Sequence, residues 1–70
     1  MSKESIYKVI EAVGTSPESW EKAVAVVVEK AAKSVRDLRV GEIVKLDVTI
    51  KDGKVEAYRA RVQLSFKYEG

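Results

Sequence analysis

The residue types of this 70-residue chain limit its chemistry to carboxylates, hydroxyls and basic side chains, because it contains no Cys and no His. This composition excludes disulfides, thiolate nucleophiles, the usual zinc sites and imidazole acid–base catalysis. The serines have no histidine to activate them, and the sequence contains no glycine-rich phosphate loop. We therefore expect no catalytic residues, no metal site of the usual kind and no enzymatic activity.

Two arginines are candidates for binding a small anion. Arg59 and Arg61 lie two residues apart, so on a strand they share one face, and copies around a symmetry axis would sum their positive charge. The alternative is that they form ion pairs between subunits. The acidic partners available for such pairs are Asp47, Glu42 and Glu56.

Scattered carboxylates offer a second possibility, a cation held at a symmetry axis of an oligomer. Oxygen ligands suit hard cations, and Glu11, Glu56 and Glu69 are the candidates. The alternative is an ordinary solvated surface, which is the usual role of dispersed acidic residues.

The charge pattern argues against nucleic-acid and membrane partners. Thirteen basic and eleven acidic residues are interspersed and give a net charge of +2, without the one-sided basic stripe of a nucleic-acid binder. No apolar stretch approaches the roughly twenty residues needed to span a bilayer, and the start, MSKESIY, lacks the apolar core of a secretory signal. We expect a cytoplasmic protein.

The elements that position these residues begin with a strand and a helix. Residues Ile6 to Val13 are rich in β-branched side chains and predict a strand buried on much of both faces. Ser16 before Pro17 is a helix-start signal, and a capping box of Thr15 with Glu18 competes with it. Apolar residues then recur every three or four positions and predict a helix of about twenty residues that covers a sheet. This stripe, with Trp20 expected in the core, comprises Trp20, Ala23, Val24, Val27, Ala31, Val35 and Leu38.

Two alternating segments, Val40 to Ile50 and Val55 to Tyr68, predict an antiparallel hairpin with its turn at Asp52-Gly53. A two-residue loop would pair Lys51 with Lys54 and set the apolar side of one strand against the polar side of the other. A three-residue loop, with Gly53 left-handed, keeps the apolar sides together. The register predicted from it pairs Val48 with Glu56, Leu46 with Tyr58 and Val44 with Ala60.

The predicted hairpin is longer than the helix that should cover it. At the usual rise per residue its strands span roughly 35 and 45 Å, against roughly 30 Å for the helix. A chain this short buries little surface, and without a disulfide or a metal it depends on association. The sheet face away from the helix is free to meet a partner. We therefore expect a closed homo-oligomer.

Three segments resemble the dodecin family: YKVIEAVGTSPESWEKAV, Leu38 to Glu42, and YRARVQLSFKYE. The resemblance covers nearly the whole chain and implies one dodecin-like domain, residues 1–70. It implies an α+β fold of β-α-β-β order, with a three-stranded antiparallel sheet wrapped around one helix. It also implies a hollow homododecamer of cubic symmetry, with trimers packed about two-fold axes.

The resemblance further implies a site for paired flavins between subunits, but three positions of that site are altered. Val40 stands where the family has a Trp that stacks on the flavin ring, within Leu-x-Trp-x-Glu. Arg59 stands where a Gln hydrogen-bonds the flavin, and Lys45 falls on an acidic position. Loss of the stacking faces costs on the order of 1 to 3 kcal/mol each. We expect a flavin-independent variant.

The expected function is that of a non-enzymatic shell that binds or stores a small ligand or an ion, with no cofactor. One alternative is a dodecin that sequesters riboflavin or FMN despite Val40. A second alternative is a purely structural or protein-interaction oligomer without a small ligand.

Overall fold

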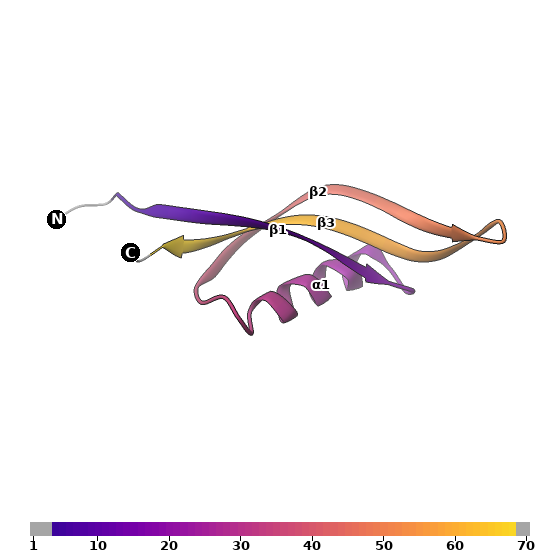
Figure 1. Ribbon diagram of the computed structural model, residues 1–70, viewed down its shortest axis with the longest axis horizontal. Helices are drawn as coiled ribbons and strands as arrows, with labels where there is room; N and C mark the ends of the chain where they lie inside the picture. Colours follow the sequence, from indigo (N-terminus) through magenta and orange to yellow (C-terminus); the bar gives the residue numbers. More distant parts are fainter. Residues whose placement is uncertain (1–3, 69–70) are drawn as a thin grey trace.

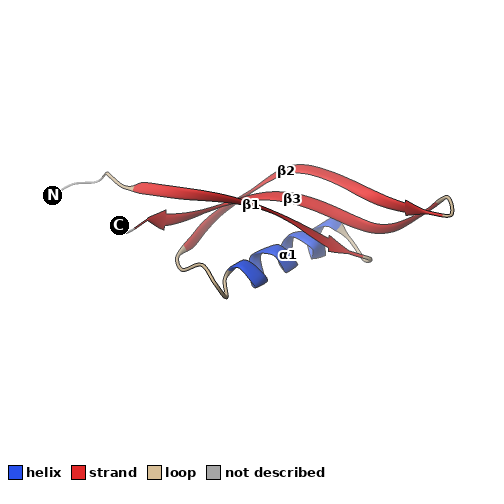
Figure 2. Ribbon diagram, in the orientation of Figure 1, coloured by secondary structure: helices blue, strands red, loops and turns tan. Residues whose placement is uncertain are grey.

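The computed structural model describes residues 4–68 and has the predicted β-α-β-β order. Its elements are β1 (Ile6–Ser16), α1 (Trp20–Ala31), β2 (Leu38–Lys51) and β3 (Lys54–Tyr68). The strands form one antiparallel sheet in the order β1-β3-β2, and α1 packs on one face of it (Figures 1 and 2). The predicted fold class is confirmed.

The molecule is elongated because the sheet is longer than its helix. Its principal extents are 58 × 20 × 15 Å. Figure 1 shows the β2–β3 hairpin continuing past one end of α1, while the opposite ends of β1 and β3 continue past the other. One helix therefore leaves both ends of the sheet uncovered, as the strand lengths predicted.

The core lies where α1 crosses the middle of the sheet. Its buried members come from the helix and from alternate positions of β3, namely Ala23, Val27, Ala60, Val62 and Leu64. Alternation on β3 places Ala60, Val62 and Leu64 on the helix side. It places Arg59, Arg61 and Gln63 on the other side. That second side is called the outer face below.

Strand β1 runs through Gly14 to Ser16 and does not end at Val13 as predicted. Gly14 is buried beneath the helix, and a Cβ built there would overlap the carbonyl oxygen of Ala23 and Cγ2 of Val27. Glycine is present because the strand and the helix approach closely at this point, and not because the strand ends there.

The helix begins later than predicted. Ser19 is the N-cap, and its Oγ accepts a hydrogen bond of 3.1 Å from the backbone N–H of Lys22. The predicted caps at Ser16 and Thr15 are therefore wrong. Ser16 Oγ instead accepts from the N–H of Glu18 at 3.0 Å, which closes a turn between β1 and α1.

The helix also ends earlier, at Ala31, and has 12 residues. Val35 and Leu38 continue the apolar spacing, but they lie in the following loop and at the start of β2. Leu38 still packs against the core, so its spacing reflects burial and not helical backbone. The loop reverses at Asp37, whose φ is +60°.

Trp20 is not a core residue in the single chain, because 37% of its surface is exposed. Its Nε1–H donates to the carbonyl oxygen of Asp47 at 3.0 Å. Its ring meets that of Tyr58 edge to face, with centroids 5.1 Å apart. These contacts hold the indole between the start of α1 and the β2–β3 ribbon.

The hairpin turn has two residues and not the predicted three. Lys51 pairs directly with Lys54, and Asp52 and Gly53 have φ values of +53° and +74°, the pattern of a type I′ turn. The predicted position of the turn at Asp52-Gly53 and the left-handed conformation of Gly53 are confirmed. The predicted register is also wrong, since the observed pairs are Val48 with Tyr58 and Leu46 with Ala60.

A β-bulge explains the difference. Thr49 pairs with Ala57 and Ile50 with Val55, so Glu56 is an extra residue in β3. The extra residue restores the pairing of apolar with apolar positions that a two-residue turn alone would break. From Lys45 to Ile50 alternation therefore predicted the correct faces but not the correct neighbours. Val44, predicted opposite Ala60, is instead an extra residue in β2 between the pairs Ile43–Val62 and Lys45–Arg61.

The positive φ at Gly53 makes a first prediction. Gly53→Val is expected to lower the free energy of unfolding by about 1 to 2 kcal/mol, because a β-branched residue is strained in the left-handed region. Gly53→Asn is the control and is expected to cost less, since Asn tolerates this conformation. Urea unfolding at equal protein concentration measures both. Equal losses for Val and Asn would contradict the assignment of strain to this φ.

Candidate functional site

The charged residues singled out from the sequence gather on the outer face, near the middle of the ribbon. Asp47 lies opposite Arg59, and Lys45 lies opposite Arg61, one pair further along. On the other side of β3, Thr15 of β1 pairs with Arg59. The sheet therefore brings Lys45 and Arg59 together.

Arg59 forms a two-pronged ion pair with Asp47. Its Nε donates to Oδ1 at 2.7 Å and its Nη2 to Oδ2 at 3.0 Å. Planar guanidinium and carboxylate groups match each other in this geometry. The structure shows Arg59 paired with Asp47 within one chain, whereas the sequence suggested a pair between subunits.

The ion pair sets the protonation of its members. The hydrogen bonds from Arg59 hold the pKa of Asp47 below its ordinary value, although desolvation opposes the shift, and the charges of Arg59, Lys45 and Arg61 lower it further. The same hydrogen bonds raise the pKa of Arg59. The positive charge of Arg59 is therefore balanced by Asp47. Lys45 and Arg61 are exposed cations on adjacent strands.

This arrangement predicts an acid-dependent loss of stability. Because the folded-state pKa of Asp47 lies below its value in the unfolded chain, its carboxylate stabilises the fold above about pH 4. That contribution is lost as the pH falls through the folded-state pKa. Asp47→Asn is therefore expected to be less stable than the native protein at about pH 6, and this difference is expected to shrink as the pH falls toward about 2.

Unfolding midpoints measured at both pH values test this, with Asp52→Asn at the hairpin turn as the matched loss of one carboxylate. If the native and Asp47→Asn proteins keep the same difference in stability at both pH values, the ion pair is not the source.

Val40 lies apart from the other two altered positions. It is opposite Ser65 on β3, six residues along the strand from Arg59, or roughly 20 Å away. Its side chain is 56% exposed. A depression of about 120 Å³ beside it is lined by Val28, Leu38, Arg39, Val40, Gly41 and Leu64. Within one chain the structure therefore does not bring Val40 together with Lys45 and Arg59.

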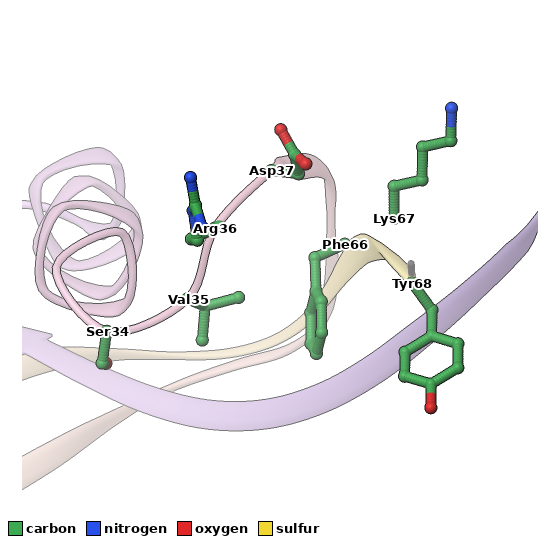
Figure 3. A pocket seen from close by; sticks show the side chains of 7 residues that line it. All are labelled: Ser34, Val35, Arg36, Asp37, Phe66, Lys67 and Tyr68. Atoms are coloured by element: carbon green, nitrogen blue, oxygen red, sulfur yellow. The ribbon is translucent and has the colours of Figure 1, made fainter. Parts of the chain in front are cut away.

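A cavity near the end of β3 was not predicted from the sequence. It has a volume of about 620 Å³ and lies between the loop after α1 and the end of β3. Its lining comprises Ser34, Val35, Arg36, Asp37, Phe66, Lys67 and Tyr68. The N–H of Lys67 donates to the carbonyl oxygen of Asp37 at 3.2 Å, which joins the two walls. In Figure 3 the charged ends of Arg36, Asp37 and Lys67 lie on one side, and Val35 and Phe66 on the other.

No periodic or motif signal identifies this cavity, because its two walls are about thirty positions apart and meet only through the fold. Lys8 Nζ lies 4.6 Å from the centroid of the Tyr68 ring, a cation–π contact beside the cavity.

A second, apolar groove was also missed. It has a volume of about 230 Å³ and lies between the first turn of α1 and β2. Its lining, called the Trp20 groove below, comprises Trp20, Glu21, Val24, Ile43 and Leu46. The amphipathic pattern assigned Trp20 and Val24 to a core, so it gave no sign that both border an open surface.

The expected cation carboxylates, Glu11, Glu56 and Glu69, do not gather in the single chain. Glu11 pairs with Gln63 on the outer face, and Glu56 lies at the bulge, where its Oε1 accepts from Thr49 Oγ1 at 3.4 Å. Glu42, named above only as an ion-pair partner, lies on the other side of Gln63 from Glu11. Glu69 lies outside the described residues. Within residues 4–68, no three acidic side chains gather closely enough to hold a metal ion. The same residues contain no helix of the length and hydropathy needed to cross a membrane.

The comparisons with known proteins agree with this fold. The sequence model of the Dodecin family matches residues 6–69. The chain belongs to the dodecin family. The resemblance noted in the sequence is thus confirmed over nearly the whole chain.

Two relatives and two solved structures illustrate the membership. Calcium dodecin of Mycobacterium tuberculosis is 43% identical over 63 residues, which covers 90% of this chain and 89% of the relative. Dodecin of Thermus thermophilus is 33% identical over 64 residues, covering 91% and 93%.

Among solved structures, dodecin from Streptomyces coelicolor superimposes with a TM-score of 0.92 at 32% identity, over 99% of each chain. The crystal structure of the M. tuberculosis calcium dodecin, described as having a novel calcium-binding site, gives a TM-score of 0.82 at 44% identity, over 93% of each chain.

Proposed function

We propose that this dodecin assembles into a cytoplasmic homododecameric shell, catalyses no reaction, and binds or stores an ion or a small ligand. Each chain contributes one dodecin-like domain. The flavin site of the family is lost in this variant, so the protein acts without a cofactor.

The observation that carries the proposal is the amount of apolar surface that one chain leaves exposed. Among residues 4–68, five apolar residues form the buried core, whereas large apolar side chains remain exposed along the sheet. The exposed fractions include 64% for Ile6, 56% for Val9, 51% for Ile43 and 68% for Ile50. Exposed apolar surface on this scale is typical of an interface, and burial against other copies supplies the core that one chain lacks.

The altered positions support the loss of flavin binding. Val40 presents an isopropyl group in place of a flat π-face. Arg59 is held by Asp47 at 2.7 and 3.0 Å, and a guanidinium has no acceptor with which to complement a flavin edge as a carboxamide does. Lys45 faces Arg61 and adds positive charge where the family has an acid. None of the three provides the stacking or the carboxamide contacts of a flavin site.

Ion binding is supported by the relative that is named a calcium dodecin and 43% identical to this chain. Oxygen ligands suit a calcium ion, and a symmetry axis brings copies of one carboxylate together. Glu11 and Glu42, on the outer face, are the described carboxylates we propose for this role. Arg61 and Lys45 offer the corresponding site for a small anion.

Two titrations of the purified protein test the proposal. Riboflavin and FMN fluorescence is expected to stay unquenched, and equilibrium dialysis is expected to show Ca²⁺ uptake by the assembled protein that Glu11→Gln/Glu42→Gln reduces at least tenfold. Strong flavin quenching would overturn the proposal in favour of a flavin-sequestering dodecin. An assembly that takes up neither flavin nor ion would favour a purely structural or protein-interaction oligomer.

A further inference from the structure

The tip of the β2–β3 hairpin carries an apolar pair that its own chain does not cover. Ile50 and Val55 lie directly opposite each other, so their side chains share one face of the ribbon. They are 68% and 51% exposed. Figure 1 shows this tip beyond the end of α1, so no element of the same chain lies over it.

The Trp20 groove has the complementary shape. Its walls are apolar, and Ile43 and Leu46 are 51% and 45% exposed. The indole wall is held in place before any partner arrives, because Trp20 Nε1 donates to the Asp47 carbonyl and its ring packs on Tyr58. An apolar cavity of roughly 150 Å³ holds a benzene ring, so a groove of about 230 Å³ accepts two branched aliphatic side chains.

The charges beside the two surfaces are opposite. Lys51 and Lys54 flank the apolar pair at the tip and face each other across the turn. Glu21, in the first turn of α1, borders the groove. Asp52 lies beyond the apolar pair, at the end of the turn. Docking would therefore place a lysine of the tip beside Glu21 and relieve the repulsion between Lys51 and Lys54.

The tip and groove of one chain cannot meet. Ile50 lies four residues beyond Leu46 on the same strand, or roughly 13 Å further along it, and the strand continues away from the groove. The contact must therefore join two molecules. Each copy has one tip and one groove, so every copy can both donate a tip and receive one, as a closed assembly of identical copies requires.

We propose that the hairpin tip of one copy, through Ile50 and Val55, docks in the Trp20 groove of a second copy. A lysine of the tip then pairs with Glu21 at the rim. This inference rests on the assembly proposed above and specifies one of its contacts.

Disulfide trapping tests the contact, because the native chain has no Cys. Ile50→Cys/Val24→Cys is expected to form covalent multimers under mild oxidation, and each single variant is not. Ile6→Cys/Val24→Cys is the matched control, since Ile6 is equally exposed but lies at the opposite end of the sheet. Trapping in the control to the same extent would overturn the proposal.

Charge substitution provides a second readout that does not depend on disulfide geometry. Ile50→Glu/Val55→Glu is expected to weaken assembly at least 100-fold. At concentrations where it still assembles, it is expected to keep its far-ultraviolet circular dichroism, because neither side chain is in the core. Glu21→Lys is expected to weaken assembly about tenfold, and Glu21→Lys/Lys51→Glu/Lys54→Glu to restore it.

The results separate this contact from the proposed function. A native protein that sediments as a monomer would overturn both the hairpin contact and the proposed shell. A native assembly that survives Ile50→Glu/Val55→Glu unchanged, and is not trapped by Ile50→Cys/Val24→Cys, would overturn the hairpin contact and leave the shell intact.

Discussion

Gly14→Ala is expected to lower the free energy of unfolding by about 3 kcal/mol or more, or to prevent folding. The added methyl group would overlap the carbonyl oxygen of Ala23, which is fixed in the α1 backbone, and Cγ2 of Val27. A side chain can rotate away from such an overlap, but a helix carbonyl cannot. The helix would have to lift from β1 and open the core around Ala60, which pairs with Gly14.

Gly41→Ala is the matched control. A Cβ at Gly41 would lie 3.4 Å from Cδ2 of Leu64 and 3.6 Å from Cγ1 of Val62, which are ordinary contacts. We expect a change within about 1 kcal/mol. Urea unfolding followed by Trp20 fluorescence, at equal protein concentration, compares the two variants. Similar losses for both would contradict the close helix–strand approach at Gly14.

Val40→Trp/Arg59→Gln is expected to bind riboflavin at least about thirtyfold more tightly than the native protein. Each restored stacking face contributes on the order of 1 to 3 kcal/mol, and a paired site uses two of them. Val40 has room for the larger ring in the single chain, since it is 56% exposed. The glutamine replaces an arginine that is otherwise held by Asp47.

Val40→Leu/Arg59→Gln is the control, because leucine adds apolar volume without a π-face. It is expected to leave riboflavin fluorescence as unquenched as the native protein does. Native protein that already quenches as strongly as Val40→Trp/Arg59→Gln would show that Val40 does not abolish the flavin site.

The alternation of side chains predicted much of the fold. The order of the elements, the faces of β3 and of β2 after Val44, and the left-handed Gly53 all follow from local patterns. The register of β2 against β3 could not be predicted from these patterns. The extra residue Glu56 changes the parity of the pairing, and no residue pattern identifies it as a bulge. The end of α1 was missed because Leu38 packs on the same core from a strand.

The candidate site was predictable only in part. Opposite charges named Asp47 as a partner of Arg59, but whether the pair forms within or between chains depends on the register. The Trp20 groove combines residues from α1 and β2 that share no short-range pattern. Val40 and Arg59 lie far apart in one chain, so a site that contains both depends on how copies pack.

Sedimentation velocity at micromolar concentration tests most directly whether these chains close into a shell. Twelve chains of 7.8 kDa are expected to sediment as one particle of about 94 kDa, with no smaller species. A folded particle of 7.8 kDa that persists at this concentration would contradict the shell, because one chain would then be stable with its apolar sheet ends exposed to water.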